Sequence, residues 1–405
     1  MLIVPRLKTG SFPRWLARDS YCHIVVVCIA WYTISSFASQ VTKRILTQCP
    51  LPLFLGEFQF VYTVFLAATT CCVARYCSWF YNMFPDGTFP DYSRPGVPVL
   101  TRPSTSIFQT VLPLGFFQFV GKYFGHKATS LVPVSTVASI KTLSPVFIVL
   151  AQKVLRIGAR KLNAGTYFSL LCVIGGVWII VCHDSKPLQA KEPSSSNALT
   201  QVEVATSVTA TIATTTTAAS SAGVLYAVIS MLVFVAQNIY GKKVFTFRQD
   251  PAASPLEPKE RNASPLPVYT NRKALSAQAT QYDKLTLMIY ISAVGFTFSI
   301  GWFLALEWPI IWNHLMHSGH QEITIPWSML FLNGTFHFFQ AMITFHLLGE
   351  ISTLSYSIAN LMKRIAIISV SWVFTAREIT SHQLFGLFLN AAGLFLYERF
   401  NSRRK

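Results

Sequence analysis

Apolar segments long enough to cross a lipid bilayer recur along this 405-residue chain, and they constrain its fold more than any other feature. A membrane-spanning helix needs about 20 predominantly apolar residues. The chain is 52% hydrophobic and only 12% charged, unlike a soluble domain. We therefore expect an all-α integral membrane protein with ten transmembrane helices. The expected ranges are 21–39, 52–74, 107–125, 132–152, 162–182, 222–241, 285–306, 327–347, 352–376 and 380–398.

Two polar segments interrupt the series of apolar ranges. Residues 183–221 contain a Thr/Ser/Ala run, and residues 246–282 are rich in Pro, Ala, Ser and charge. Such compositions do not support a packed core, so both segments are predicted to be disordered. The first segment separates the fifth and sixth helices. We therefore expect one five-helix group at 21–182 and a second at 222–398.

Basic residues outside the expected helices lie mainly on one side of the membrane. If the tail 1–20 is cytosolic, alternate loops and the tail 399–405 are cytosolic too; together they hold 23 of the 33 Lys and Arg residues, and the other loops hold seven. Cytosolic loops carry such an excess in membrane proteins. The net charge of +17 thus predicts cytosolic termini rather than a nucleic-acid partner. Residues 1–20 also lack the apolar core of a cleavable secretory signal.

The three remaining cations fall inside expected helices. Lys141 lies in the fourth helix, and Lys363 and Arg364 lie in the ninth. Each costs roughly 2.5–3.5 kcal/mol at a helix centre unless something compensates. No acid stands at the centre of a span; Glu57 and Glu350 come nearest. We therefore expect the cations to bind an anion in a wet cavity, and the alternative is that they reach toward the membrane interface.

The positions of these cations also predict a shared site. The ninth helix is the fourth of the second group, so Lys141 and the Lys363/Arg364 pair occupy equivalent helices. In many transporters two inverted repeats meet at a substrate site near the membrane midplane. Lysine offers a mobile point charge and arginine a planar fork for phosphate oxygens. Since adjacent helical residues point about 100° apart, one member of the pair is expected to be the closer ligand.

Two local features predict how the third and fourth helices behave. Pro145 follows Lys141 by four residues, so it cannot donate to the Lys141 carbonyl, and we expect a kink that frees this oxygen. Gly121 and Gly125 form a GxxxG pair, which predicts close packing against another helix.

The sequence offers little for catalysis or metal binding. His314, His317 and His320 have metal-like spacing, but they lie in an expected loop without a clear fourth ligand, so we interpret them as solvated. The eight cysteines show no repeated CxxC spacing. Phosphate-loop, dinucleotide-binding, GxSxG and HExxH motifs are absent, so we expect neither an enzyme nor a cofactor.

Four stretches carry a resemblance to a known family. They are "WYTISSFASQVTKRIL" (31–46), "VPVSTVASIKTLSPVF" (132–147), "GVLYAVISMLVFVAQNIYGKKVF" (223–245) and "SYSIANLMKRIAIISVSWVF" (355–374). The chain resembles the triose-phosphate translocator family of the drug/metabolite transporter superfamily. It is most similar to the fungal branch named for suppression of loss of Ypt, which belongs to the endoplasmic reticulum or Golgi. The resemblance implies ten helices in two inverted five-helix repeats.

The resemblance also implies a phosphate site formed by Lys141, Lys363 and Arg364. Around it the chain departs from the plastid members: Lys122 stands where they have a histidine, Gly125 where they have a threonine, and Gln340 where they have a tyrosine. Further candidates for cargo contacts are therefore Lys122 and Gln340, and, on the ninth helix, Tyr356 and Asn360.

The expected function is secondary active transport. We predict an antiporter that exchanges a phosphorylated metabolite such as a sugar phosphate for inorganic phosphate, across an endoplasmic reticulum or Golgi membrane. The alternatives are a nucleotide-sugar transporter and a membrane protein that acts in vesicle traffic between these compartments.

Overall fold

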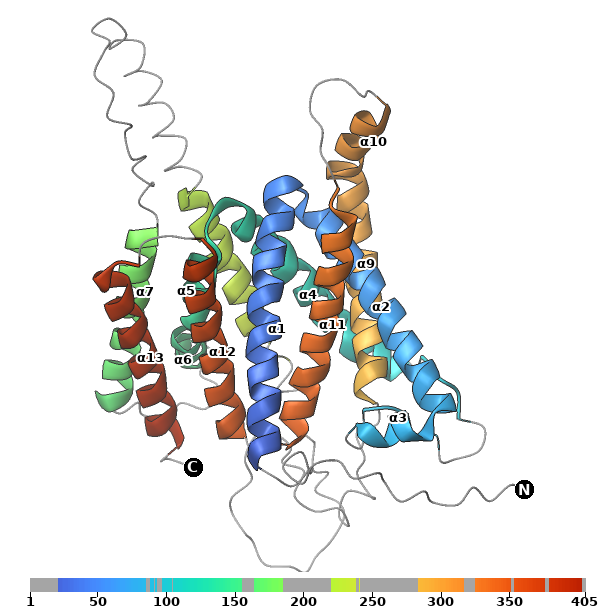
Figure 1. Cartoon of the computed structure of the whole chain (residues 1–405), viewed down its shortest axis with the longest axis horizontal. Coiled ribbons are helices and arrows are strands. Elements are labelled where there is room, and N and C mark those ends of the chain that lie inside the picture. The colour runs from blue at the N-terminus through green and yellow to red at the C-terminus, as the bar shows by residue number, and fades with distance from the viewer. Residues whose placement is uncertain are drawn as a thin grey trace, which may run out of the picture.

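The described part of the chain is entirely helical outside its short turns (Figure 1). This computed structural model describes residues 21–84, 88–90, 92, 97–103, 105–154, 164–184, 220–237, 240, 283–316, 325–350, 353–375 and 379–402. A helix occupies each of the ten ranges expected from the sequence. Most of both polar segments, 183–221 and 246–282, lies outside the described residues.

The helices follow one another along the chain with short turns between several of them. In chain order they are α1 Tyr21–Gln48, α2 Pro52–Tyr76, α3 Ser78–Met83, α4 Thr105–Leu131, α5 Val134–Thr142, α6 Ser144–Val154, α7 Ala164–Asp184, the unlabelled helix Ser220–Gln237, α9 Lys284–Leu306, α10 Trp308–Met316, α11 Trp327–Glu350, α12 Thr353–Phe374 and α13 Ser381–Ser402.

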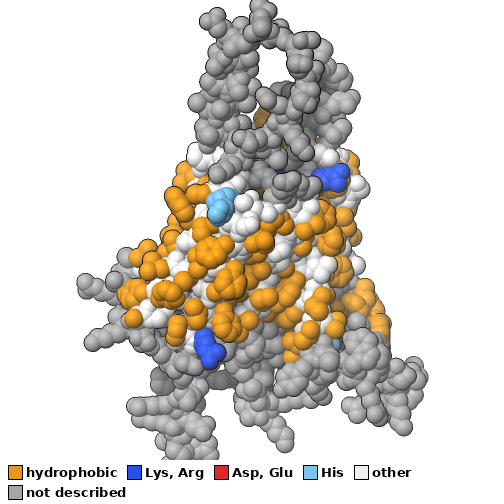
Figure 2. Space-filling view, turned by 60° about the vertical axis from the view of Figure 1, so that its left-hand side comes forward, with side chains coloured by type: hydrophobic (Ala, Val, Ile, Leu, Met, Phe, Trp, Pro, Cys, Tyr) orange, Lys and Arg blue, Asp and Glu red, His pale blue; other side chains and the backbone are white. Residues whose placement is uncertain are grey.

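Several of these helices are suited to a lipid environment. Within the described residues, α1 from His23, α2, α7, Ser220–Gln237 and α9 are long and apolar enough to cross a membrane. Large apolar side chains point outward from the bundle, among them Leu171 and Trp178, which are 66% and 71% exposed. Figure 2 shows a broad hydrophobic surface with Lys or Arg side chains at its upper and lower margins. The chain is therefore a multi-pass membrane protein, as its sequence predicted.

The fourth expected helix is broken beside its lysine. α5 ends at Thr142, α6 begins at Ser144, and Leu143 between them has φ −71° and ψ −6°. The break falls where Pro145 removes a backbone donor. The predicted kink next to Lys141 is therefore confirmed.

Two short helices lie in ranges that were expected to be loops. α3 follows α2 almost directly, and α10 follows α9 after Glu307. His314 belongs to α10, so its assignment to a loop was wrong; His317 and His320 lie outside the described residues. Trp308, Pro309, Ile310 and Ile311 give α10 an apolar first turn, which a search for segments of about 20 residues overlooks.

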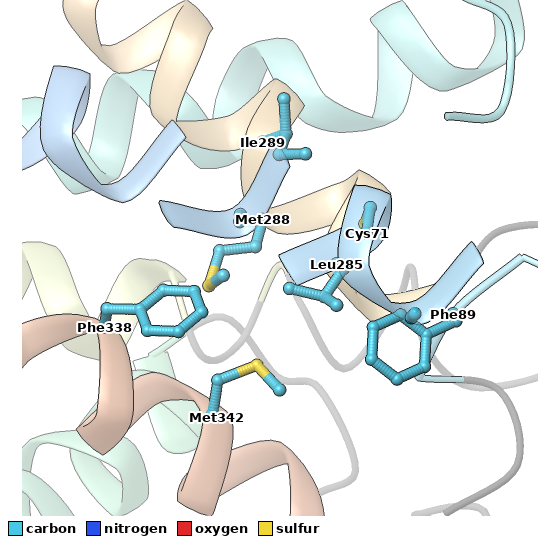
Figure 3. Packing of buried hydrophobic residues seen from close by; sticks show 9 residues of the cluster. Cys71, Phe89, Leu285, Met288, Ile289, Phe338 and Met342 are labelled. Carbon is cyan, nitrogen blue, oxygen red and sulfur yellow. The ribbon is translucent and has the colours of Figure 1, made fainter. Parts of the chain in front are cut away.

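The core consists of several apolar clusters at helix junctions. The cluster in Figure 3 joins α2, α9 and α11 through Cys71, Leu285, Met288, Phe338 and Met342. Another cluster joins α5, α7 and α12. The latter fixes α5 against α12, the two helices that carry the cations predicted to bind phosphate.

Glycines bring α7 and α13 into backbone contact. A Cβ added at Gly176 would lie 2.6 Å from the Asn390 nitrogen and from the Gly386 oxygen, and one at Gly393 would lie 2.8 Å from the Val173 nitrogen. Real Cβ atoms do not approach backbone atoms this closely. The glycines of these two helices therefore act as a packing surface between the first and second groups of helices.

Charged side chains bind the ends of helices on one side of the bundle. Lys43 Nζ, near the end of α1, donates to the carbonyl oxygens of Thr129, Ser130 and Val132 at the end of α4, at 2.8–3.1 Å. The last carbonyls of a helix have no partner within it and attract cations. Lys43 thus fixes the end of α4 to α1.

Two buried carboxylates bind residues near the starts of helices, Glu307 through backbone N–H groups and Asp184 through side chains. Glu307 accepts the N–H groups of Leu53 and Phe54 at the start of α2, at 2.9 and 2.7 Å. Asp184, at the end of α7, accepts hydrogen bonds from Thr136 Oγ1 on α5 at 3.0 Å and from Gln383 Nε2 on α13 at 2.8 Å. N–H groups at a helix start favour negative partners.

Candidate anion-binding site

Lys141 lies in the last turn of α5 and faces a gap provided by a glycine. A Cβ added at Gly125 on α4 would lie 3.9 Å from Lys141 Nζ and 3.1 Å from Ser230 Oγ. The ammonium also lies 5.4 Å from the ring centroid of Phe234, in cation–π range. A side chain at residue 125 would therefore press on Ser230 Oγ, and it would reach Lys141 Nζ only at an ordinary contact distance.

The predicted GxxxG pair packs against the Ser220–Gln237 helix, next to Lys141. Ser230 Oγ, on the Ser220–Gln237 helix, donates to the Gly121 carbonyl oxygen at 2.8 Å. A Cβ at Gly121 would lie 3.2 Å from the Phe234 ring. The close packing predicted for Gly121 and Gly125 is confirmed, and it brings α4 against a helix of the second group.

Arg364 binds the broken helix rather than standing free in the interior. Its Nη1 donates to the Lys141 carbonyl oxygen and, at 3.1 Å, to Ser144 Oγ. The first acceptor is the oxygen that Pro145 leaves without its usual donor. The guanidinium therefore spans the break between α5 and α6 and holds the backbone at Lys141.

Lys363 has a different environment from its neighbour. Its Nζ lies 4.2 Å from the ring centroid of Trp31, a fully buried residue of α1. This is a favourable position for a cation over an aromatic face. Among the described residues the ammonium makes no hydrogen bond. Of the adjacent pair, Lys363 is thus the one with donors available for a ligand.

The three cations form one electrostatic group. Lys363 interacts with Arg364 and Lys141, and Lys141 interacts with Arg364. Within the described residues, no carboxylate is among the charged partners of either lysine. α5 and α12, which are far apart in the sequence, therefore bring together the three residues predicted to bind phosphate.

The other predicted cargo contacts are more dispersed. Gln340 is half-buried on α11, and its carbonyl oxygen accepts the Thr344 hydroxyl at 2.7 Å. Asn360 is half-buried on α12, one turn before the Lys363/Arg364 pair. Tyr356 belongs to α12, but its side chain lies outside the described part of the structure.

Lys122 belongs to a second cluster of ionisable side chains, which the sequence did not predict to lie together. It lies on α4 over the ring of Phe60, 4.3 Å from the centroid, and it interacts electrostatically with Glu57 on α2. His126, one turn further along α4, and His337 on α11 both interact with Lys122. Glu57 was one of the two acids that come nearest to a span centre in the sequence, but its pairing with Lys122 depends on the packing of α2 against α4.

Comparison with known proteins identifies the family. The model of the Triose-phosphate Transporter family matches residues 22–184 and 266–398, which include Lys141, Lys363 and Arg364. The chain belongs to this family. It is therefore a transporter and not an enzyme.

Proteins from a yeast and from a plant match almost the whole chain. "Uncharacterized transporter YJL193W" of Saccharomyces cerevisiae is 53% identical over 403 residues, 95% of each chain. "Uncharacterized transporter SLY41" of the same yeast is 32% identical, over 94% of this chain and 81% of the other. The chloroplastic triose phosphate/phosphate translocator of Flaveria trinervia is 20% identical, over 92% of this chain and 70% of the other.

Proposed function

We propose that this protein is a secondary carrier that exchanges a phosphorylated metabolite, such as a sugar phosphate, for inorganic phosphate. The observation that carries this proposal is the group formed by Lys141, Lys363 and Arg364, which comes from two helices of different groups and leaves both lysines without a carboxylate partner among the described residues. A dianionic phosphate supplies the missing negative charge.

The three cations have separate roles in this proposal. Lys141 and Lys363 approach phosphate oxygens as mobile point charges. Arg364 positions the site, because its guanidinium already donates to the Lys141 carbonyl and to Ser144. An empty site keeps its positive charges unbalanced in the membrane interior, which opposes reorientation without cargo and favours strict exchange.

The proposed architecture is two inverted five-helix repeats, 21–182 and 222–398, that alternate in exposing the site to either side. Both termini face the cytosol, as the distribution of Lys and Arg predicts. The resemblance to the fungal branch supports placement in the endoplasmic reticulum or Golgi.

Counterflow in liposomes tests this function. Purified protein is reconstituted with internal phosphate, and uptake of labelled phosphate is measured with sugar phosphates, phosphoenolpyruvate and nucleotide sugars as competitors. We expect uptake that requires internal phosphate and that falls at least ten-fold in Lys141→Gln and Lys363→Gln. Lys191→Gln, in the segment between the two groups, serves as the control for loss of a lysine.

Three results would overturn the proposal. They are efficient uptake into vesicles without internal anion, full activity of both site variants, and competition by nucleotide sugars alone. The last result would indicate a nucleotide-sugar transporter instead.

A further inference from the structure

A buried carboxylate on α2 has no role in the phosphate site. Glu57 is 6% exposed, and neither of its oxygens accepts a hydrogen bond. Lys122 Nζ is likewise buried without a hydrogen bond, and it lies 4.3 Å from the centroid of the Phe60 ring. Buried ionised groups are costly unless they are paired and hydrogen-bonded. This pair has electrostatic attraction but no hydrogen bonds to fix it.

Lys122 is the one cation among the described residues that acts on Glu57. A second charged group, the Glu307 carboxylate that follows α9, repels the Glu57 carboxylate. The hydroxyl of Ser299 on α9 also lies beside Glu57, but it donates to the Gly295 carbonyl oxygen at 2.9 Å. On α4 and α11, His126 and His337 face Lys122. If Lys122 moved away, the negative charge on Glu57 would lose its counter-charge.

The phosphate site lies within reach of the same lysine. Residues three and four apart share a face of a helix, so Lys122, Gly125 and His126 lie along one side of α4. The Cβ direction of Gly125 points to Lys141 Nζ, at 3.9 Å, and His126 interacts with both lysines. Lys122 therefore lies three residues, about 4.5 Å along the axis of α4, from Gly125, the residue of α4 that faces Lys141 Nζ. An anion held by Lys141 attracts the unanchored ammonium of Lys122.

We propose that Glu57 and the cargo compete for Lys122, so that cargo binding transfers one proton from solution to the Glu57 carboxylate. In the empty carrier Lys122 offsets ionised Glu57. When a phosphate dianion binds, Lys122 turns toward it, and Glu57 takes up a proton to form a neutral carboxylic acid. The proton crosses the membrane with the anion and is released when the cargo leaves and Lys122 returns. This inference rests on the proposed phosphate site.

Calorimetry on the full-length protein in detergent tests the proton uptake. Inorganic phosphate is titrated in two buffers with different ionisation enthalpies, which gives the number of protons taken up for each phosphate bound. We expect the wild type to take up about one proton more than Glu57→Gln does. Ionisation of phosphate itself is common to all variants and cancels in this difference.

Two further variants make the result specific. Asp184→Asn removes a buried carboxylate that accepts hydrogen bonds from Thr136 Oγ1 and Gln383 Nε2 and is not among the charges that act on Glu57, so it should take up as many protons as the wild type. Lys122→Met removes the shared cation, so it should lose the additional proton as Glu57→Gln does. This variant keeps the test valid if Glu57→Gln does not fold.

The outcomes separate this inference from the proposed function. Phosphate binding with equal proton uptake in the wild type, Glu57→Gln and Lys122→Met would refute proton coupling and leave the phosphate site intact. Absence of phosphate binding by the folded wild type would refute both.

Discussion

At the scale of single residues, the contrast between Lys363 and Arg364 is the most informative feature. The two are adjacent and carry the same charge, yet one lies over an aromatic ring and the other binds the backbone across a helix break. Arginine suits the second role because its planar fork donates to two acceptors at once. The pair thus combines one cation over an aromatic ring with one fixed to the backbone at the helix break.

This division of roles predicts different tolerance to substitution. Arg364→Lys keeps the charge but cannot donate to the Lys141 carbonyl and Ser144 Oγ with the same geometry. Loss of a charged hydrogen bond costs about 1.5–3 kcal/mol, so we expect a reduction of about ten- to a hundred-fold in phosphate counterflow. The initial rate of uptake, normalised to folded protein, measures it. Ser144→Ala, which removes only the longer bond, should lose less; equal activity of Arg364→Lys and wild type would contradict the positioning role.

Lys43 and Arg44 offer a second test at this scale. Lys43 donates to three carbonyl oxygens at the end of α4, whereas its neighbour Arg44 is exposed. Lys43→Met leaves these carbonyls without their donor and should lower the free energy of unfolding by about 1.5–3 kcal/mol. Arg44→Met should change it by less than about 0.5 kcal/mol. Thermal unfolding in detergent compares the two, and similar midpoints would show that the α4 contact is not stabilising.

Some of these residues could be predicted from the sequence and others could not, and the difference has a physical reason. Lys141, Lys363 and Arg364 stand out because cations in long apolar segments are costly and rare. Glu57 and Lys122 each lie closer to the end of an apolar segment, where a charge needs no special explanation. Their pairing depends on how α2 packs against α4, which no local pattern encodes.

At the scale of helices, backbone contact between α7 and α13 is the tightest junction described. The consecutive glycines 175 and 176 make a matched pair of test positions. A Cβ at Gly176 would lie 2.6 Å from α13 backbone atoms, whereas one at Gly175 would lie an ordinary 3.5 Å from Leu389 Cδ2.

We expect Gly176→Ala to separate the two helices and to destabilise the protein by about 1–3 kcal/mol. Gly175→Ala should be neutral or stabilising by up to about 1 kcal/mol, because alanine favours helix. Thermal unfolding and the yield of monodisperse protein would measure both changes. If Gly176→Ala matched Gly175→Ala, the close approach would not be a requirement of the fold.

Helix prediction succeeded where the determinants are local. Pro145 predicted the break between α5 and α6, because the missing N–H acts on a residue only four positions away. α10 was missed since nine residues are too few to span a membrane, and its apolar first turn was read as part of a loop. The acceptor of Arg364 was also beyond prediction, as it requires α12 to lie beside the break.

At the scale of the whole molecule, the distribution of Lys and Arg predicts the orientation in the membrane. The segment 183–221 should face the lumen, and the segment 246–282 should face the cytosol. Both segments contain sequences that can report their side. Asn262-Ala263-Ser264 is a natural glycosylation acceptor sequence in the second, and Leu199→Ser completes one that begins at Asn197 in the first.

In cells with a glycosylating endoplasmic reticulum, we expect Leu199→Ser to add one glycan and Asn262 to remain unmodified. A shift in electrophoretic mobility that is removed by a glycosidase measures the modification. Adding Asn197→Gln to Leu199→Ser provides the control, since it removes the new acceptor. A glycan on Asn262 in the wild type would reverse the predicted orientation.

The bond from Arg364 to the Lys141 carbonyl also bears on how the chain is assembled. Its two partners are 223 residues apart, which corresponds to roughly 10–45 s of synthesis at about 5–20 residues per second. During that interval α5 has already been made, with its charged side chain and with a carbonyl oxygen that lacks the N–H donor absent from Pro145, and Arg364, which donates to this oxygen, has not yet been synthesised. The first group of helices is therefore inserted into the membrane before the Lys141 carbonyl oxygen can accept its hydrogen bond from Arg364. That hydrogen bond forms only after α12 has been inserted.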